Sequence, residues 1–121
     1  MIKSINPSNG ELIKEYESYS DNDVLSIINQ VSTGYINWKD TSFDERLKIL
    51  LDVANSLNEN IEEHARMISL EIGKPITESR MEIEKCVWVL QYFAENAEEF
   101  LKSESIETGY KESYVQYDPL G

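Results

Sequence analysis

The strongest constraint on the fold comes from residues 77–101, a long helical pattern whose middle is apolar on more than one side. A helix with one buried face has a single apolar stripe, and the apolar residues here are too many for one stripe. They are Ile83, Cys86, Val87, Trp88, Val89, Leu90, Tyr92 and Phe93. Such a helix is normally buried from two directions. Three shorter helices can cover one side. We expect the other side to pack against a further surface, which need not be part of this chain.

Local signals predict three shorter helices upstream of this segment. Ser20 is a favourable N-cap with carboxylates in the turn that follows, and apolar residues then recur at helical spacing to about Trp38. The segment 42–45 has the pattern of a capping box and begins a second helix. A third helix is expected from near Asn60, with Gly73 as the residue that ends it.

The two ends of the chain are predicted to be extended. Ile5 and Leu12 flank a cluster of turn-forming residues at 6–10, which predicts a β-hairpin. Residues 106–110 and 114–117 alternate in polarity, which predicts one or two strands. We therefore expect this segment to be mainly α, with about four helices, an N-terminal β-hairpin and C-terminal β-strands.

Composition excludes several classes of protein. The chain has 11 Lys and Arg against 23 Asp and Glu, a net charge of −12, which disfavours nucleic acids and anionic membrane surfaces as partners. No stretch reaches the roughly 18 to 20 apolar residues of a membrane span. A single cysteine excludes an internal disulfide, and with no secretory pattern it favours a cytoplasmic location.

Residues with catalytic or ligand-binding chemistry are few. The glycines are too far apart for a nucleotide-phosphate loop, so we expect no cofactor-binding motif in this segment. His64 lacks a second imidazole or thiol partner and is interpreted as a partly exposed helical residue rather than a metal ligand. Cys86 is interpreted as a small buried side chain rather than a nucleophile. Acidic pairs are interpreted as solvated helix faces rather than catalytic pairs: Glu62/Glu63, Glu82/Glu84 and Glu98/Glu99.

Short motifs follow one another along nearly the whole chain. They are Ile5-Asn6-Pro7-Ser8-Asn9-Gly10-Glu11; Trp38, Ser42, Glu45-Arg46 and Leu50; Glu71-Ile72-Gly73-Lys74-Pro75-Ile76 with Glu78-Ser79; Glu82-Ile83; and Val115, Tyr117 with Pro119-Leu120-Gly121. In this order and spacing they resemble the amino-terminal part of the aldehyde dehydrogenase superfamily. The position of the hairpin near Met1 and the ending at 117–121 resemble its bacterial succinate-semialdehyde branch most.

The resemblance implies a parent protein of α/β class, with an aldehyde dehydrogenase-like, Rossmann-type three-layer fold. Residues 1–121 would be the N-terminal portion of its dinucleotide-binding domain, with about 104–118 starting the oligomerisation strands and the catalytic domain absent. The complete enzyme would use NAD or NADP to oxidise a small aldehyde, in this branch succinate semialdehyde, to a carboxylic acid. It would be a homo-oligomer.

In this family a cysteine thiolate adds to the aldehyde, a hydride passes to the nicotinamide, and a water activated by a glutamate hydrolyses the thioester. These groups lie beyond the position that matches Gly121, so no catalytic, cofactor-binding or metal residue is carried over to this chain. The segment alone is therefore expected to bind no cofactor, to be inactive and to need the remainder of the enzyme as its partner.

The resemblance gives one residue a candidate role. Lys85 lies early in the helix that runs past the mouth of the family's substrate tunnel, where it could attract an acidic semialdehyde. The alternative is a solvated or ion-paired lysine with no effect on substrate. For the chain as a whole, a second interpretation is a self-contained acidic helical protein-interaction module that binds a basic partner or a copy of itself.

Overall fold

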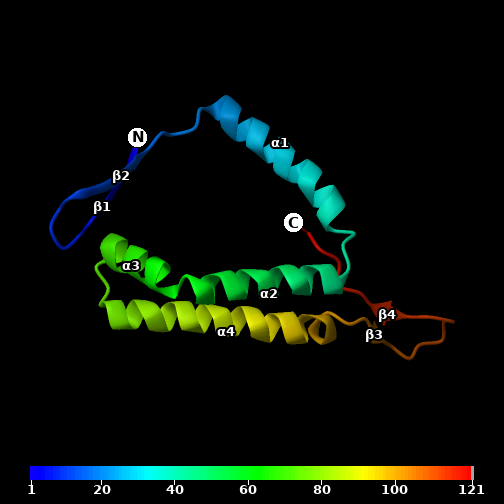
Figure 1. The fold of residues 1–121 in the computed structure, drawn as a ribbon. Coiled ribbons are helices and arrows are strands. Elements are labelled where there is room, and N and C mark those ends of the chain that lie inside the picture. Colours follow the sequence, from blue (N-terminus) through cyan, green and yellow to red (C-terminus); the bar gives the residue numbers. More distant parts are fainter. Residues whose placement is uncertain (121) are drawn as a thin grey trace.

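The computed structural model describes residues 1–120 and is mainly helical, with a small antiparallel strand pair near each end (Figure 1). In chain order the elements are β1 (Ile2–Ile5), β2 (Leu12–Tyr16), α1 (Asp21–Trp38), α2 (Phe43–Glu59), α3 (Ile61–Ile72), α4 (Ile76–Phe100), β3 (Glu104–Ser105) and β4 (Tyr114–Val115). The predicted fold class of this segment is confirmed, and so are the four helices and the N-terminal hairpin.

Serine capping boxes begin the first two helices, as the sequence predicted. In α1 the Asp23 N–H donates to Ser20 Oγ at 3.3 Å, and the Ser20 N–H donates to the Asp23 carboxylate at 3.0 Å. In α2 the Glu45 N–H and the Ser42 N–H make the same reciprocal bonds, at 3.3 and 2.9 Å. Each pair satisfies backbone N–H groups that have no partner within the helix.

The core lies where α4 runs along α2 and α3 (Figure 1). Its buried apolar side chains are Ala54 on α2, Ala65 on α3, and Ile83 and Ala94 on α4. Both Ala54 and Ala65 have no exposed surface, so the helices approach each other closely at these positions. The helices α2, α3 and α4 therefore form one packed unit, which we call the three-helix unit.

Helix α1 stands apart from the three-helix unit (Figure 1). None of its residues is buried, and within residues 1–120 it makes no extensive contact with another helix or strand. The expectation that three helices would cover one side of α4 is therefore wrong, because only α2 and α3 do so. The Tyr35 hydroxyl donates to the Pro119 carbonyl, which joins α1 to the last described residues.

The turn between α1 and α2 explains why α1 points away from α4. The Arg46 guanidinium donates to Thr41 Oγ1 at 2.9 Å and to the Lys39 carbonyl at 2.9 Å. Its carbon also lies 5.7 Å from the centre of the Trp38 ring and 5.8 Å from that of Phe43, within the range of cation–π contact. This one side chain ties the end of α1 to the start of α2 and fixes the direction in which α1 leaves.

The N-terminal hairpin rests its tip on the turn between α3 and α4. Ser4 Oγ donates to the Glu71 carboxylate at 2.7 Å. Gly73, with a φ of +76°, ends α3 in the left-handed region, and a Cβ there would lie 3.0 Å from Cγ of Pro7. Glycine is required at this position both by the backbone conformation and by the approach of the hairpin.

The second strand pair is shorter than the sequence predicted. β3 pairs with β4 only at Glu104–Ser105, and the alternating segment 106–110 is not a strand. Beyond this pairing the Ile106 N–H donates to the Ser113 carbonyl, and a polar turn follows in which the Thr108 and Ser113 hydroxyls are hydrogen-bonded to each other. The expected pair of strands is present, but the first lies upstream of the predicted position.

The second side of α4 is uncovered, as its apolar pattern predicted. Trp88 is 61 % exposed, and it lies near Tyr92 in a chain of aromatic contacts that includes Phe93 and Phe100. The accessible surface is 10004 Å², whereas a compact monomer of 14.0 kDa has about 6,700 Å². None of the helices in residues 1–120 combines the length and the apolar character needed to cross a bilayer.

Candidate functional site

An open depression of about 610 Å³ lies on the three-helix unit. Leu57 of α2 and Ile68 of α3 form part of its wall. The remaining lining residues follow one another along α4 at helical spacing: Glu82, Ile83, Lys85, Cys86, Val89 and Leu90. Its lining is apolar apart from the side chains of Glu82 and Lys85, so the two charges stand beside a hydrophobic surface.

The two charged residues of this depression have different surroundings. Glu82 forms an ion pair with Lys74, which comes from the turn before α4 and whose side chain is only 27 % exposed. Lys85 is exposed, and none of the ion pairs formed within residues 1–120 includes it. The carboxylate is therefore compensated, while the charge of Lys85 is free to act on a molecule that enters the depression.

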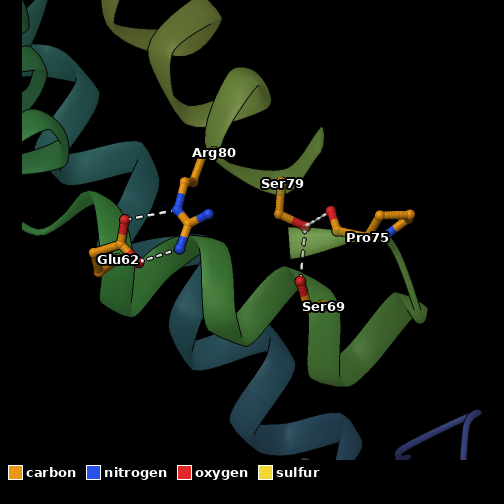
Figure 2. A network of polar contacts seen from close by, with 5 residues as sticks. All are labelled: Glu62, Ser69, Pro75, Ser79 and Arg80. Atoms are coloured by element: carbon orange, nitrogen blue, oxygen red, sulfur yellow. Dashed lines mark hydrogen bonds and ion pairs between the residues drawn. The ribbon is translucent and has the colours of Figure 1, made fainter. Parts of the chain in front are cut away.

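A polar network holds α3 against the start of α4 (Figure 2), and its α4 residues come just before those that line the depression. Ser79 is fully buried, and its hydroxyl lies 2.9 Å from Ser69 Oγ and 3.3 Å from the Pro75 carbonyl. On the same two helices, Arg80 donates two hydrogen bonds to the Glu62 carboxylate, at 2.7 and 2.9 Å. These contacts fix the first turns of α4, and with them the positions of Glu82 and Lys85.

The Arg80–Glu62 pair shifts the pKa of both groups. Hydrogen bonds from Arg80 hold the pKa of the Glu62 carboxyl below its ordinary value, and the carboxylate raises the pKa of the guanidinium. Both groups stay charged near neutral pH, so the pair persists there. Sequence reasoning missed this pair because the partners come from different helices, which no local spacing reveals.

The residues singled out in the sequence take different places in the structure. His64 is half-buried on α3, in agreement with its interpretation as a partly exposed helical residue. Residues 1–120 contain no group of three metal-ligating side chains close enough to hold an ion. The members of the three acidic pairs are all exposed, as expected of solvated helix faces.

Cys86 does not have the buried position that the sequence interpretation gave it. It is exposed, whereas we expected it to be a buried side chain. It lies in the apolar middle of α4 but on a part of the helix surface that neither α2 nor α3 covers, at the edge of the depression. Apolar neighbours in the sequence therefore did not lead to burial of Cys86 among the described residues.

The arrangement suits binding rather than bond-breaking chemistry. An apolar wall beside an uncompensated ammonium group can hold a short hydrocarbon that carries a negative charge. The lining contains a thiol, a carboxylate and an ammonium group, but the carboxylate is held by Lys74 and no hydrogen bond links the thiol to a base within residues 1–120. Nucleophilic catalysis needs such a base to be in place.

Comparison with known proteins gives a consistent set of relatives. The sequence model of the aldehyde dehydrogenase family matches residues 1–121. The chain is 31 % identical over 118 residues to the succinate semialdehyde dehydrogenase Sad of Escherichia coli (strain K12), named as an NAD(P)+ enzyme, and the match covers 98 % of this chain and 26 % of that protein. It is 29 % identical over 120 residues to a probable NADP(+) succinate-semialdehyde dehydrogenase of Synechocystis, covering 99 % and 26 %.

A solved structure has the same fold. The succinic semialdehyde dehydrogenase of Streptococcus pyogenes, in complex with NADP+, superposes with a TM-score of 0.87 at 26 % identity, over 94 % of this chain and 25 % of that one. The chain thus spans about a quarter of the length of the relatives it matches. The resemblance seen in the sequence motifs is confirmed. Since the family match extends over all of its residues, the chain belongs to the aldehyde dehydrogenase family.

Proposed function

We propose that this chain is the N-terminal portion of the dinucleotide-binding domain of an aldehyde dehydrogenase that oxidises succinate semialdehyde to succinate with NAD or NADP. The observation that carries the proposal is the match of the whole chain to relatives named as succinate semialdehyde dehydrogenases, in sequence and in fold. The uncovered side of α4 and the large accessible surface support a role as part of a larger molecule.

The described residues do not fit the phosphates of NAD or NADP. Backbone N–H groups at the start of a helix commonly hold such phosphates. Here the first turn of every helix in residues 1–120 carries at least one carboxylate, which repels a phosphate. We therefore assign no cofactor contact and no catalytic step to these residues, and the cofactor would bind to the remainder of the enzyme.

The β3–β4 ribbon is assigned to assembly. It extends away from the three-helix unit (Figure 1), and outside their pairing with each other its two short strands have free edges among the described residues. Free strand edges are sites where another strand can add. Residues of about 104–118 would accordingly start the strands through which copies of the enzyme associate, giving a homo-oligomer.

Within this proposal, Lys85 attracts the carboxylate of the semialdehyde while the apolar wall of the depression accommodates its methylene groups. Replacing Lys85 by methionine should lower kcat/KM for succinate semialdehyde roughly two- to fivefold relative to butanal, as expected for an exposed charge worth about 1 kcal/mol or less. The effect should shrink as ionic strength rises. Lys48→Met, at an exposed position on α2, is the matched control. Equal losses for both aldehydes would contradict the role of Lys85.

The proposed function is tested by an assay of the complete enzyme that contains this chain. We expect succinate semialdehyde to be oxidised with formation of NADH or NADPH, and the 121-residue chain alone to form neither. If the complete enzyme oxidises no aldehyde with either cofactor, the function is wrong. If the chain alone turns over an aldehyde, the catalytic groups lie within it and their assignment to the rest of the enzyme is wrong.

A further inference from the structure

We propose that Lys74 is a positioning residue that keeps the charge of Lys85 available, by holding Glu82 in an ion pair. The inference rests on the proposed function of Lys85 at the depression. It concerns specificity: with Lys74 in place the site favours an anionic aldehyde, and without Lys74 this preference is lost.

Glu82 and Lys85 lie on the same face of α4. They are three residues apart on α4 and line the same depression. Side chains at this spacing are neighbours on a helix surface and readily form an ion pair. The other residues three or four positions from Lys85 are Met81, Trp88 and Val89, which carry no charge. Glu82 is therefore the carboxylate on α4 that is best placed to neutralise Lys85.

Glu82 is already engaged in an ion pair. Its ion-pair partner in the structure is Lys74, and Lys85 is left without one among the described residues. The side chain of Lys74 is less exposed than that of Glu82, 27 % against 47 %. A partly buried partner is less screened by water than a fully solvated one, which favours the observed pair over the alternative pair with Lys85.

Lys74 lies in a turn whose two neighbouring residues are restrained. It lies between Gly73, held in the left-handed region, and Pro75, whose carbonyl accepts a hydrogen bond from the buried Ser79 hydroxyl (Figure 2). Ser79 in turn contacts Ser69 on α3. The backbone of Lys74 is therefore restrained on both sides, so only its side chain has to be ordered when the ammonium pairs with Glu82.

Removal of the Lys74 charge should release Glu82 to Lys85. In the complete enzyme, Lys74→Met should lower the ratio of kcat/KM for succinate semialdehyde to kcat/KM for butanal roughly two- to fivefold, close to the effect of Lys85→Met, mainly through KM. Lys74→Arg, which keeps the ion pair, should retain the ratio. The double variant Lys74→Met/Glu82→Gln should recover it, because the released carboxylate is gone.

A second readout does not depend on turnover. The amine of Lys85 can be labelled by reductive methylation and its rate followed by mass spectrometry of the peptide. An amine held by a carboxylate reacts more slowly, so Lys74→Met should slow the labelling of Lys85, and the added Glu82→Gln should restore it. Lys48→Met, which breaks an ion pair with Asp52 elsewhere on the surface, should change neither this rate nor the kinetic ratio.

These outcomes separate the inference from the proposed function. A labelling rate of Lys85 that is the same with and without Lys74 overturns the inference, whatever the enzyme oxidises. A loss of kcat/KM that is equal for both aldehydes, and that Glu82→Gln does not reverse, also overturns it, because Lys74 would then act only on the stability of the turn. An unmodified enzyme that oxidises neither aldehyde overturns the proposed function, while the labelling rates still decide whether Lys74 controls Glu82.

Discussion

Helices α1 and α2 begin in the same way and have different surroundings. Each starts with a serine whose hydroxyl and backbone form a capping box with a carboxylate three residues later. Each has apolar residues at helical spacing, yet α2 buries Ala54 completely against α4, whereas α1 buries nothing. Local signals thus determine that a helix forms, and the presence of a complementary surface determines whether it packs.

The largest expected difference between the two regions is in how much the free energy of unfolding falls when an isoleucine is shortened to alanine. Ile83→Ala in the three-helix unit should lower the free energy of unfolding by about 2–3 kcal/mol, because it removes buried methyl groups from a small core. Ile28→Ala in α1, where the side chain is 56 % exposed, should change it by about 0.5 kcal/mol or less. Urea denaturation of both variants measures this difference, and equal losses would show that α1 is packed after all.

A smaller effect, of opposite sign in the two regions, is expected from the same change of glycine to alanine. Gly73→Ala should destabilise the chain by about 1–2 kcal/mol, because φ is positive and the new Cβ would meet Pro7. Gly34→Ala in α1 meets no atom within 4 Å and should stabilise that helix by up to about 1 kcal/mol.

Far-ultraviolet circular dichroism and thermal unfolding of the two glycine variants test this sign. An increase in helix content without a change in the unfolding midpoint is expected for Gly34→Ala, since α1 is not coupled to the core. A lowered midpoint for Gly34→Ala, or an unchanged one for Gly73→Ala, would contradict the structural account of that position.

The smallest expected effect is the loss of helix-cap stability at acid pH. Hydrogen bonds from Ser42 lower the pKa of Glu45, first through its N–H and then through its hydroxyl, and Ser20 lowers the pKa of Asp23 mainly through its hydroxyl. A lowered pKa in the folded state stabilises a cap above the ordinary values, 4.5 for Glu and 3.8 for Asp, and this stability is lost as pH falls through the folded pKa.

A pH titration followed by circular dichroism therefore should show loss of helix below about pH 4.5. Glu45→Gln should remove the part of this loss that is coupled to unfolding of the three-helix unit. Asp23→Asn should remove only a gradual loss that belongs to α1. If Asp23→Asn instead changed the part of the loss that accompanies unfolding of the three-helix unit, α1 would be part of the core.

What could be predicted from the sequence was local. The caps at Ser20 and Ser42, the left-handed Gly73 and the turn at 6–10 all rest on neighbouring residues, and all are present in the structure. The double apolar face of α4 also indicated correctly that one side stays uncovered, because that pattern is a property of the helix itself.

What could not be predicted depends on distant parts of the chain. The bonds of Arg80 to Glu62 and of Ser79 to Ser69 join α4 to α3, and no spacing in the sequence pairs these residues. The same holds for the orientation of α1, which Arg46 sets through the turn at 39–42. In the candidate site, Lys85 was singled out from the family resemblance, whereas the ion pair of Lys74 with Glu82 follows only from the folded structure.

Hydrogen exchange tests most directly whether the three-helix unit packs within this chain by itself while α1 packs only within a larger enzyme. Exchange is measured on the amides of the 121-residue chain by itself and within the complete enzyme. In the chain alone, amides of α2, α3 and α4 should be protected together and those of α1 should exchange as a frayed helix. In the complete enzyme, α1 should gain strong protection. Protection of α1 equal to that of α4 in the isolated chain would contradict the account.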